Sequence, residues 1–300
     1  MQESIRRSTE DRIYDAIVTV VLLLLLLIVA YPLYFVIIAS ISDPRLVATG
    51  RVLLWPMSFS LDGYKEVLEY SPIWTGYRNT LFYTTGFTLL SVMVSLMAGY
   101  ALARKPFPGK TAITAFFLFT MFFSGGLIPT YLLMREIGLY GKPIIIILIG
   151  AVNVTNIIIS RTFMKSTIPE ELYEASVIDG CNHFQFFFRV ALPVSKALIA
   201  VLVLFAAVSQ WNSWFPAMIY LTKSEYMPLQ MVLRDLIVSQ SALSLAADTA
   251  IMGGDTAAQL YLVESMRYAV IIVSSLPILC FYPFVQKYFV KGIMIGSVKG

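Results

Sequence analysis

Few residues of this chain could perform chemistry, and none of them is arranged as an active site. His183 is the only histidine, so it has no second imidazole with which to hold a metal ion. The run PGKT, residues Pro108–Thr111, matches the end of a phosphate-binding loop, but that motif needs a glycine where Arg104 stands. The sequence therefore predicts no catalytic residue, no metal site and no cofactor bound to this chain.

Two groups of polar residues could instead bind a partner or a solute. The first is the segment STIPEELYEASVIDGCNHFQFFFRVALP, residues 166–193, which interrupts an otherwise apolar chain. The second lies inside apolar segments and consists of Asn153, Asn156, Gln210, Trp211, Asn212 and Trp214. Because polar side chains in membrane spans usually face protein or water, these six residues are candidates for a solute pathway.

The spacing of the second group predicts shared helical faces. Gln210 and Ser213 are three residues apart, as are Trp211 and Trp214, so the two pairs form neighbouring stripes on one helix. The alternative is hydrogen bonding between helices, with the two Trp residues in the aromatic belt at the membrane surface.

The composition is that of a membrane protein. Of the 300 residues, 58% are hydrophobic and 13% are charged, whereas soluble domains have about 45–50% apolar and about 25% charged residues. The net charge of +4 does not indicate nucleic acid, because the Lys and Arg residues stand at the ends of apolar segments. The first apolar run, Ile13–Ile41, is longer than the core of a signal peptide, so we expect a retained anchor.

Six segments approach the length of about 20 apolar residues that crosses a bilayer. They are Ile13–Ile41, Thr80–Ala103, Ala112–Met134, Pro143–Ser160, Leu198–Leu221 and Tyr268–Tyr288. The predicted fold class is therefore all-α, a polytopic membrane protein with six transmembrane helices. Residues 13–288 would form one transmembrane domain, with residues 1–12 and 289–300 as its two tails.

The distribution of Lys and Arg predicts the orientation of the spans. These residues precede the first span, occupy the short turn between the second and third spans, and follow the sixth span. Because positively charged loops stay in the cytoplasm, both termini and residues 166–193 are predicted to be cytoplasmic. No ionisable side chain lies in the middle of a span, which disfavours an ion-coupled carrier.

The polar interruption, hereafter the 166–193 loop, carries the signals of two short helices joined by a bend. Thr167 and Glu170 have the spacing of a capping box, so the first helix is predicted to begin there. It would run to Gly180, which can adopt the left-handed conformation that ends a helix. Asn182 and Gln185 repeat the capping pattern and predict the start of the second helix.

Both helices offer a surface to a soluble partner. Ala175 and Ser176 lie on one face of the first helix, where small side chains let a partner backbone approach closely. On the second helix, Phe184, Phe187 and Phe188 would form an apolar knob. Burial of each ring is worth about 1.5–3 kcal/mol, so we expect the knob to occupy a protein pocket. Contact of these rings with the bilayer surface is the alternative.

The sequence EASVIDGCNHFQFFFRVALP resembles the EAA loop of binding-protein-dependent ABC importer permeases. The matching positions are Glu174, Ala175 and Ser176, then Gly180, and finally Val190, Leu192 and Pro193. The stretches FFSGGLIPTYLLMREIGLYG and YPFVQKYFVKGIMIGSVKG are similar to the carbohydrate-uptake branch, which includes the smaller permease subunit of the maltose importer. Within that branch, the chain most resembles importers of oligosaccharides released from polysaccharides such as rhamnogalacturonan or alginate.

The resemblance implies that several proteins act together. The 166–193 loop would be a coupling helix seated in a cytoplasmic ABC ATPase, whose dimer would bind ATP and Mg. Its coupling residues would be Glu174, Ala175, Ser176, Asp179, Gly180, Phe184, Phe187, Phe188, Leu192 and Pro193. A second, homologous permease subunit would complete the pore in the bacterial inner membrane, and an extracytoplasmic solute-binding protein would deliver the oligosaccharide.

Two other functions fit parts of the sequence. The EAA loop alone would allow an importer of another solute. A membrane scaffold could also use the loop to dock a cytosolic protein without moving any solute.

Overall fold

The computed structural model describes residues 9–104, 107–249, 266–280 and 283. The regular secondary structure of these residues is helical. Among them no strand forms, and Ser42 and Phe59 make an isolated antiparallel bridge. Two compact units are present, Met1–Tyr70 with Leu236–Ser274, and Ser71–Asp235 with Ser275–Gly300. The predicted C-terminal tail, 289–300, and most of the N-terminal tail lie outside the described residues.

The first unit contains the long apolar helix α1 (Thr9–Ser40), followed by α2 (Pro44–Ala48) and α3 (Asp62–Glu69). Asp43 caps α2, because its side chain accepts a hydrogen bond from the backbone N–H of Arg45 at 2.8 Å. Where α1 ends, Ile38 and Ala39 form a small buried cluster with side chains that follow α1 in the chain. Most of α1 is exposed and apolar, as expected for a span that faces lipid.

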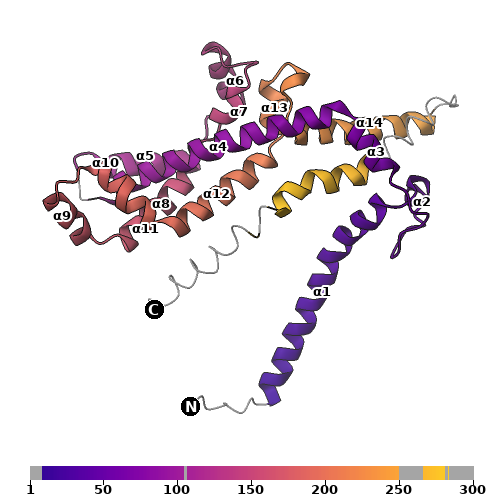
Figure 1. Ribbon diagram of the computed structural model, residues 1–300, viewed down its shortest axis with the longest axis horizontal. Coiled ribbons are helices and arrows are strands. Elements are labelled where there is room, and N and C mark those ends of the chain that lie inside the picture. The colour runs from indigo at the N-terminus through magenta and orange to yellow at the C-terminus, as the bar shows by residue number, and fades with distance from the viewer. Residues whose placement is uncertain (1–8, 105–106, 250–265, 281–282, 284–300) are drawn as a thin grey trace. The chain divides into compact units, whose positions relative to one another are not determined.

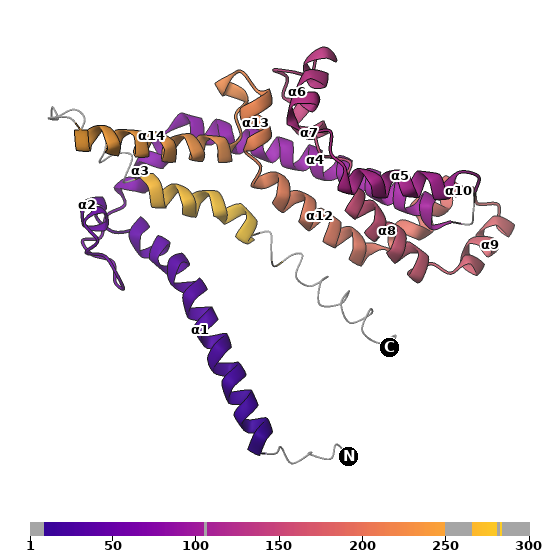
Figure 2. The ribbon, with the colours of Figure 1, turned by 180° about the vertical axis from the view of Figure 1, so that it is seen from behind.

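The second unit is built on three helices that pack side by side (Figures 1 and 2). They are α4 (Ser71–Ala103), α8 (Val154–Thr167) and α12 (Lys196–Trp211). Gly99 permits the close approach of α4 to α8, since a Cβ atom added there would lie 2.4 Å from Cβ of Ser160. The other helices of this unit are α5 (Lys110–Phe122), α6 (Leu127–Glu136), α7 (Ile144–Leu148), α13 (Phe215–Tyr220) and the 3-10 turn η2 (Ser224–Tyr226); α14 (Leu229–Thr249) continues into the first unit.

The 166–193 loop forms a set of short helices at one end of the second unit (Figure 1). These are α9 (Glu170–Ile178), α10 (His183–Phe186), the π-helical turn η1 (Phe187–Ala191) and α11 (Leu192–Val194). The axis bends by 83° between α10–α11 and α12.

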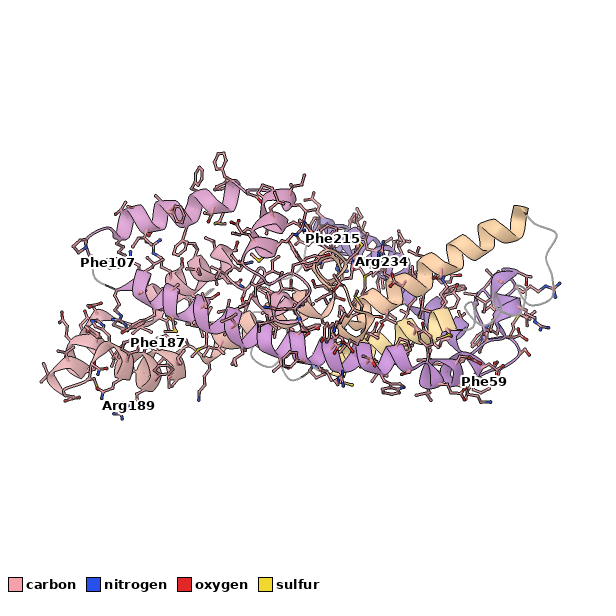
Figure 3. All side chains as sticks on the ribbon, turned by 90° about the horizontal axis from the view of Figure 1, so that it is seen from above. Phe59, Phe107, Phe187, Arg189, Phe215 and Arg234 are labelled. Atoms are coloured by element: carbon pink, nitrogen blue, oxygen red, sulfur yellow. The ribbon has the colours of Figure 1, made fainter. Side chains whose placement is uncertain are left out.

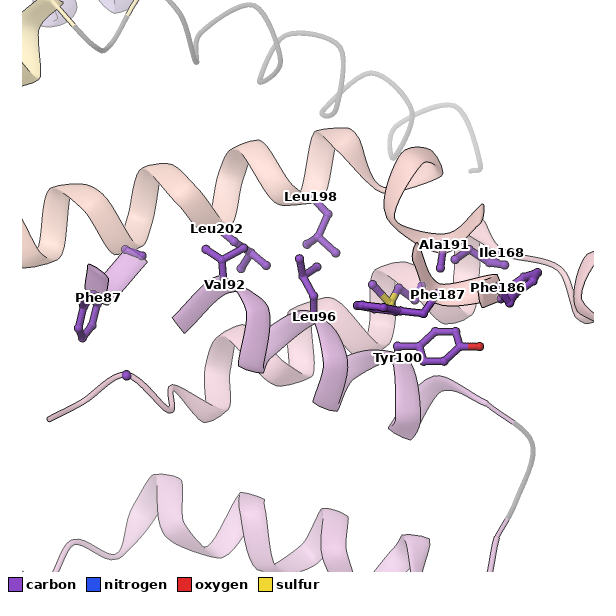
Figure 4. Packing of buried hydrophobic residues seen from close by; sticks show 13 residues of the cluster. Phe87, Val92, Leu96, Tyr100, Ile168, Phe186, Phe187, Ala191, Leu198 and Leu202 are labelled. Carbon is purple, nitrogen blue, oxygen red and sulfur yellow. The ribbon is translucent and has the colours of Figure 1, made fainter. Parts of the chain in front are cut away.

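The main core of this unit joins the loop to the long helices. Figure 4 shows Leu96 and Tyr100 of α4, Leu198 and Leu202 of α12, and Phe187 packed together. Since these side chains come from three separate segments, the core fixes the base of the loop to both long helices.

Three of the six predicted spans contain breaks. The third is divided into α5 and α6, which meet at 114°. The fourth is divided into α7 and α8, and the fifth into α12 and α13. Gly126, directly before α6, and Gly150, after α7, adopt φ values of 86° and 76° in the first two breaks, a conformation that glycine adopts without strain. The sixth is helical from Met266 to Cys280, and most of its remainder lies outside the described residues.

Among the described residues, α1 and α4 are by themselves long and apolar enough to cross a membrane. The number reaches 4 if each of two bent pairs, α5–α6 and α10–α12, counts as one span.

Candidate functional site

The start of the 166–193 loop differs from the prediction. Thr167 is the last residue of α8 and not a helix cap, because the N–H of Ile168 still donates to the carbonyl of Met164. Ile168 is extended, as expected of a residue that precedes proline, and α9 begins after Pro169 without a side-chain cap. The predicted capping box at Thr167 is therefore wrong.

The bend and the second helix start are confirmed. Gly180 has a φ of 81°, and the N–H of Cys181 donates to the carbonyl of Ser176 at 2.9 Å, which closes the end of α9. The side chain of Asn182 accepts from the N–H of Gln185 at 2.8 Å, and the N–H of Asn182 donates to the side chain of Gln185 at 3.0 Å. This reciprocal pair is the predicted capping box, and it fixes the direction in which α10 leaves the bend.

Arg104, at the end of α4, holds the base of the loop. Its guanidinium carbon lies 4.9 Å from the ring centre of Tyr100 and 4.8 Å from those of Tyr173 and Phe186. Its Nη1 is 3.4 Å from Oε2 of Glu170, and the Arg104 side chain is 11% exposed. Cation–π contacts strengthen when the cation is desolvated, so Arg104 ties both α9 and α10 to α4. No pattern in the sequence indicated this role, because Arg104 stands in a basic turn whose charge predicts only the orientation of the spans.

The three predicted Phe residues do not form one knob. Phe187 is 3% exposed, and its ring centre lies 5.2 Å from that of Tyr100 (Figure 4). Phe184 and Phe188, four residues apart on the outer face, are 69% and 48% exposed. Phe187 therefore belongs to the core of its own chain, and the prediction that it forms an exposed knob with Phe184 and Phe188 is wrong.

The remaining predicted coupling residues lie mostly at the surface. No residue of α9 is buried. Glu174, Ala175 and Asp179 are exposed, whereas Ser176 is half-buried and donates to the carbonyl of Tyr173 at 2.6 Å. At the end of the loop, Leu192 packs against the core and Pro193 is exposed in α11.

An apolar surface missed by the sequence analysis surrounds the bend. Ile178, two residues before Gly180, is 86% exposed, and Val177 is 48% exposed. With Phe184 they form what we call the tip of the loop. The sequence feature that could have predicted the exposure of Ile178 is its position directly before the predicted turn. At such a position an aliphatic side chain has no following helical turn to cover it.

A second site is a polar cavity of about 370 Å³ lined by α4, α12 and the break between α7 and α8. Three of the six predicted pathway residues, Asn153, Asn156 and Gln210, line it. Asn153 also caps α8, because its Oδ1 accepts from the N–H of Asn156 at 3.0 Å. Gln210 is buried, and its Nε2 lies 3.5 Å from the carbonyl of Ile146 in α7. The break in the fourth predicted span thus positions the amides.

Other residues of this cavity come from elements far apart in the sequence. Ser213 and Ser209 line it beside Gln210, although α12 ends at Trp211, so Ser213 does not continue the predicted helical stripe. From α4 come Phe87 and Ser91, which no sequence pattern distinguished from other span residues. Phe205, Gly150, Ile149, Ala206 and Pro216 complete the lining.

Trp211, Asn212 and Trp214 do not line the polar cavity. Trp211 is 5% exposed and lies in an apolar groove of about 570 Å³ on another face of α4 and α12. The helix ends at Trp211, so Trp214 does not continue its stripe, and the guanidinium of Arg234 lies 5.0 Å from the ring of Trp214. Asn212 donates to the carbonyl of Val208 at 2.8 Å.

The lining of the polar cavity defines the kind of solute that fits it. It contains amides, hydroxyls and two Phe rings, and no ionisable side chain is among its described residues. Amides and hydroxyls can donate and accept hydrogen bonds, and aromatic rings provide flat apolar faces. Such a lining suits an uncharged solute with many hydroxyl groups.

Comparison with known proteins gives the family. The chain is 35% identical over 291 residues to the polygalacturonan/rhamnogalacturonan transport system permease protein YtcP of Bacillus subtilis (strain 168), covering 97% of this chain and 100% of YtcP. The chain belongs to the permease family of sugar ABC transporters. No family model matches this permease.

Further relatives agree with this membership. The permease is 26% identical over 251 residues to the melibiose/raffinose/stachyose import permease protein MelC of Bacillus subtilis (strain 168), covering 82% of the permease and 84% of MelC. It is also similar to a chain in the crystal structure of a bacterial ABC transporter involved in the import of the acidic polysaccharide alginate. The TM-score is 0.85 at 33% identity, covering 95% of the permease and 100% of that chain.

The predicted resemblance to carbohydrate ABC importers is therefore confirmed. Permeases of this family are the membrane components of ABC transporters, in which a separate subunit uses ATP.

Proposed function

We propose that the permease forms half of the pore of an oligosaccharide importer and that the tip of its loop docks a cytoplasmic ATPase. The observation that carries this proposal is the contrast between the two ends of the loop. The base is fixed by Arg104 and Phe187, whereas the tip exposes Ile178 and Phe184. Exposed apolar side chains on a rigid support are typical of a protein-binding surface.

The packing at the base of the loop supports a mechanical connection between the tip and the proposed solute pathway. The base of the loop packs against Tyr100 of α4 and Leu198 of α12, and the same two helices line the polar cavity. In this mechanism ATP and Mg bind the ATPase dimer, whose closure displaces the tip. Because the base is firmly packed, that displacement moves α4 and α12 and changes the access to the cavity from outside to inside. Glu174, Ala175, Ser176, Asp179 and Gly180 would complete the docking surface.

The proposed topology retains six spans within residues 13–288, with the broken segments each counted as one span. Both termini and the loop would lie in the cytoplasm, as the Lys and Arg residues predict. A second, homologous permease would close the pore, and a solute-binding protein would deliver the oligosaccharide on the opposite side of the inner membrane.

The polar cavity is the proposed part of the pathway that contacts the sugar. Its hydroxyl and amide lining fits the hydroxyl groups of a saccharide, and Phe87 and Phe205 offer apolar faces to the ring. Because the described lining has no cation, the carboxylates of an acidic oligosaccharide would have to be neutralised elsewhere.

The docking proposal is tested by isolating the tagged permease from its native membrane. We expect an ATPase and a second permease to accompany the wild type. The variants Ile178→Asp and Phe184→Asp should lose the ATPase and keep the second permease. The control is Phe59→Asp, which changes a residue that is 71% exposed outside the loop. A wild-type permease that is isolated alone would contradict the proposal.

A membrane scaffold is distinguished from an importer by ATPase measurements on the assembled complex. A loaded solute-binding protein should stimulate the ATPase of an importer and leave that of a scaffold complex unchanged.

The cavity proposal is tested by measuring oligosaccharide uptake. Loss of one solute hydrogen bond, worth about 0.5–1.5 kcal/mol, should lower uptake by Asn156→Ala about two- to tenfold without loss of assembly. Asn212→Ala is the matched control, because Asn212 does not line the cavity. Equal uptake by both variants would exclude Asn156 from the pathway.

A further inference from the structure

A separate cavity lies where α4, α5 and α8 meet, beside the base of the loop. Its volume is about 340 Å³, and its polar lining consists of Arg104, Lys110, Lys165 and Glu170. It shares no residue with the polar cavity of the solute pathway. It also contains none of the predicted coupling residues, although two of its lining residues, Arg104 and Glu170, form the ion pair at the base of the loop.

The charge around this cavity is strongly positive. Lys165 and Arg161 are four residues apart on α8 and therefore share a face. Both lie close enough to Lys110 to act on it electrostatically. Arg104, Lys110 and Lys165 line the cavity, Arg161 lies on the same face of α8 as Lys165, and Glu170 is the acidic side chain in the described lining.

Several polar atoms at this site have no partner. The Nε atoms of Arg161 and Arg104 are buried without a hydrogen-bond acceptor, and Oε1 of Glu170 is buried without a donor. Arg161 and Lys165 form no ion pair with any described residue. Lys110 donates to the backbone carbonyl of Arg104, and no ion pair with a described carboxylate is formed by its ammonium. A buried donor without an acceptor costs about 1–3 kcal/mol, so a ligand that supplies acceptors would be stabilised here.

The unsatisfied atoms specify the chemistry of such a ligand. Buried guanidinium N–H groups and an unpaired ammonium require an anion with several acceptor oxygens, which a phosphate provides. The free oxygen of Glu170 requires a hydroxyl donor next to that anion.

The place of the cavity indicates where the ligand comes from. The cavity lies between the end of the apolar helix α4 and the start of the apolar helix α5. The ends of membrane helices lie at the level of the lipid headgroups, where basic residues attract anionic phospholipids. We propose that this cavity binds a phosphate with a neighbouring hydroxyl, supplied by the glycerophosphate headgroup of an acidic phospholipid. A bound headgroup would also stabilise the base of the loop, because the cavity shares Arg104 and Glu170 with it.

Native mass spectrometry of the full-length permease, with any subunits that accompany it, tests this proposal. The probes are phosphatidylglycerol, phosphatidylcholine and free glycerol 3-phosphate. The variants are Lys165→Gln and the double variant Arg161→Gln with Lys165→Gln. The matched control is Lys196→Gln, which removes an exposed positive charge at the start of α12, outside the cavity.

A basic residue near an anionic lipid contributes about 1 kcal/mol, so each removed charge should lower phosphatidylglycerol binding about fivefold. Lys196→Gln should bind as the wild type does, and phosphatidylcholine should bind weakly to every variant. Because Lys165 is exposed, Lys165→Gln should fold normally. This single variant therefore tests the proposal even if the double variant does not fold.

Each outcome decides the proposal. Binding of phosphatidylglycerol that falls with Lys165→Gln supports a lipid site. Binding of glycerol 3-phosphate that falls in the same way supports the phosphate site and identifies a soluble ligand. Equal losses in Lys165→Gln and Lys196→Gln would overturn the proposal, because lipid binding would then depend on net charge alone. No loss in either variant would also overturn it, because lipid binding would then not involve this cavity.

Discussion

Replacement of Arg104 by alanine should detach α9 from the end of α4. The guanidinium contacts the rings of Tyr100, Tyr173 and Phe186 at 4.8–4.9 Å, and the side chain is 11% exposed. A cation–π contact contributes about 0.5–2 kcal/mol as the cation is desolvated, so three contacts at about 1 kcal/mol each give about 3 kcal/mol. The ion pair with Glu170 adds to this value, and its loss would leave a half-buried carboxylate without its cation.

A free-energy change of about 3 kcal/mol corresponds to an increase of about a hundredfold in the detached population of α9. Amide hydrogen exchange measures this population directly, because detached helices exchange faster. We therefore expect the amides of Glu170–Ile178 to exchange about a hundredfold faster in Arg104→Ala. In the assembled transporter, ATP hydrolysis should continue while oligosaccharide uptake falls.

Arg189→Ala provides the matched control, since Arg189 is exposed at the same end of the unit (Figure 3). Arg104→Lys should have an intermediate effect, because lysine keeps the charge but lacks the planar group that stacks on the rings. Unchanged exchange of α9 in Arg104→Ala would refute the argument that this residue holds the loop.

Three further predictions concern stability and local structure. Gly99→Leu should lower the thermal stability of the purified permease, because its Cβ would meet the backbone of α8. Gly125→Ala should leave the thermal stability unchanged, because there is open space around Gly125. Equal effects of the two substitutions would contradict the close packing of α4 against α8. Phe187→Ala should cost about 3–5 kcal/mol of unfolding free energy, since the ring is buried, whereas the half-exposed Phe188→Ala should cost much less in the same denaturation experiment. A larger cost for Phe188→Ala than for Phe187→Ala would contradict the burial of Phe187. Asn182→Ala should remove a helix cap worth about 1 kcal/mol, seen as faster exchange of the amides of α10; wild-type exchange would show that the capping box is not formed in solution.

Local patterns determined much of the 166–193 loop. Gly180 and the Asn182–Gln185 pair predicted the bend and the start of α10, because their hydrogen bonds join residues close together in the chain. The capping box at Thr167 was predicted on the same basis and failed. At that position α8 continues through Thr167, and the local pattern could not show where the preceding helix would end.

The direction in which similar side chains point was decided by tertiary packing. Phe184, Phe187 and Phe188 have the same chemistry in sequence, yet Phe187 alone is buried, since Tyr100 of α4 lies against it. Trp211 likewise lies in the apolar groove and not in the polar cavity. Neither outcome follows from helical spacing, because spacing gives relative faces and not the neighbour that each face meets.

The sequence by itself determined that this is an all-helical membrane protein with an exposed polar loop, because apolar runs of span length and capping signals are local properties. Its long, spaced loop motif also indicated the permease family. Only the tertiary structure decided where the spans break and which residues meet at the two polar cavities. The physical reason is that α4 packs against α8 and α12. This packing brings together Ser91, Asn156 and Gln210 at one cavity, and Arg104 and Lys165 at the other.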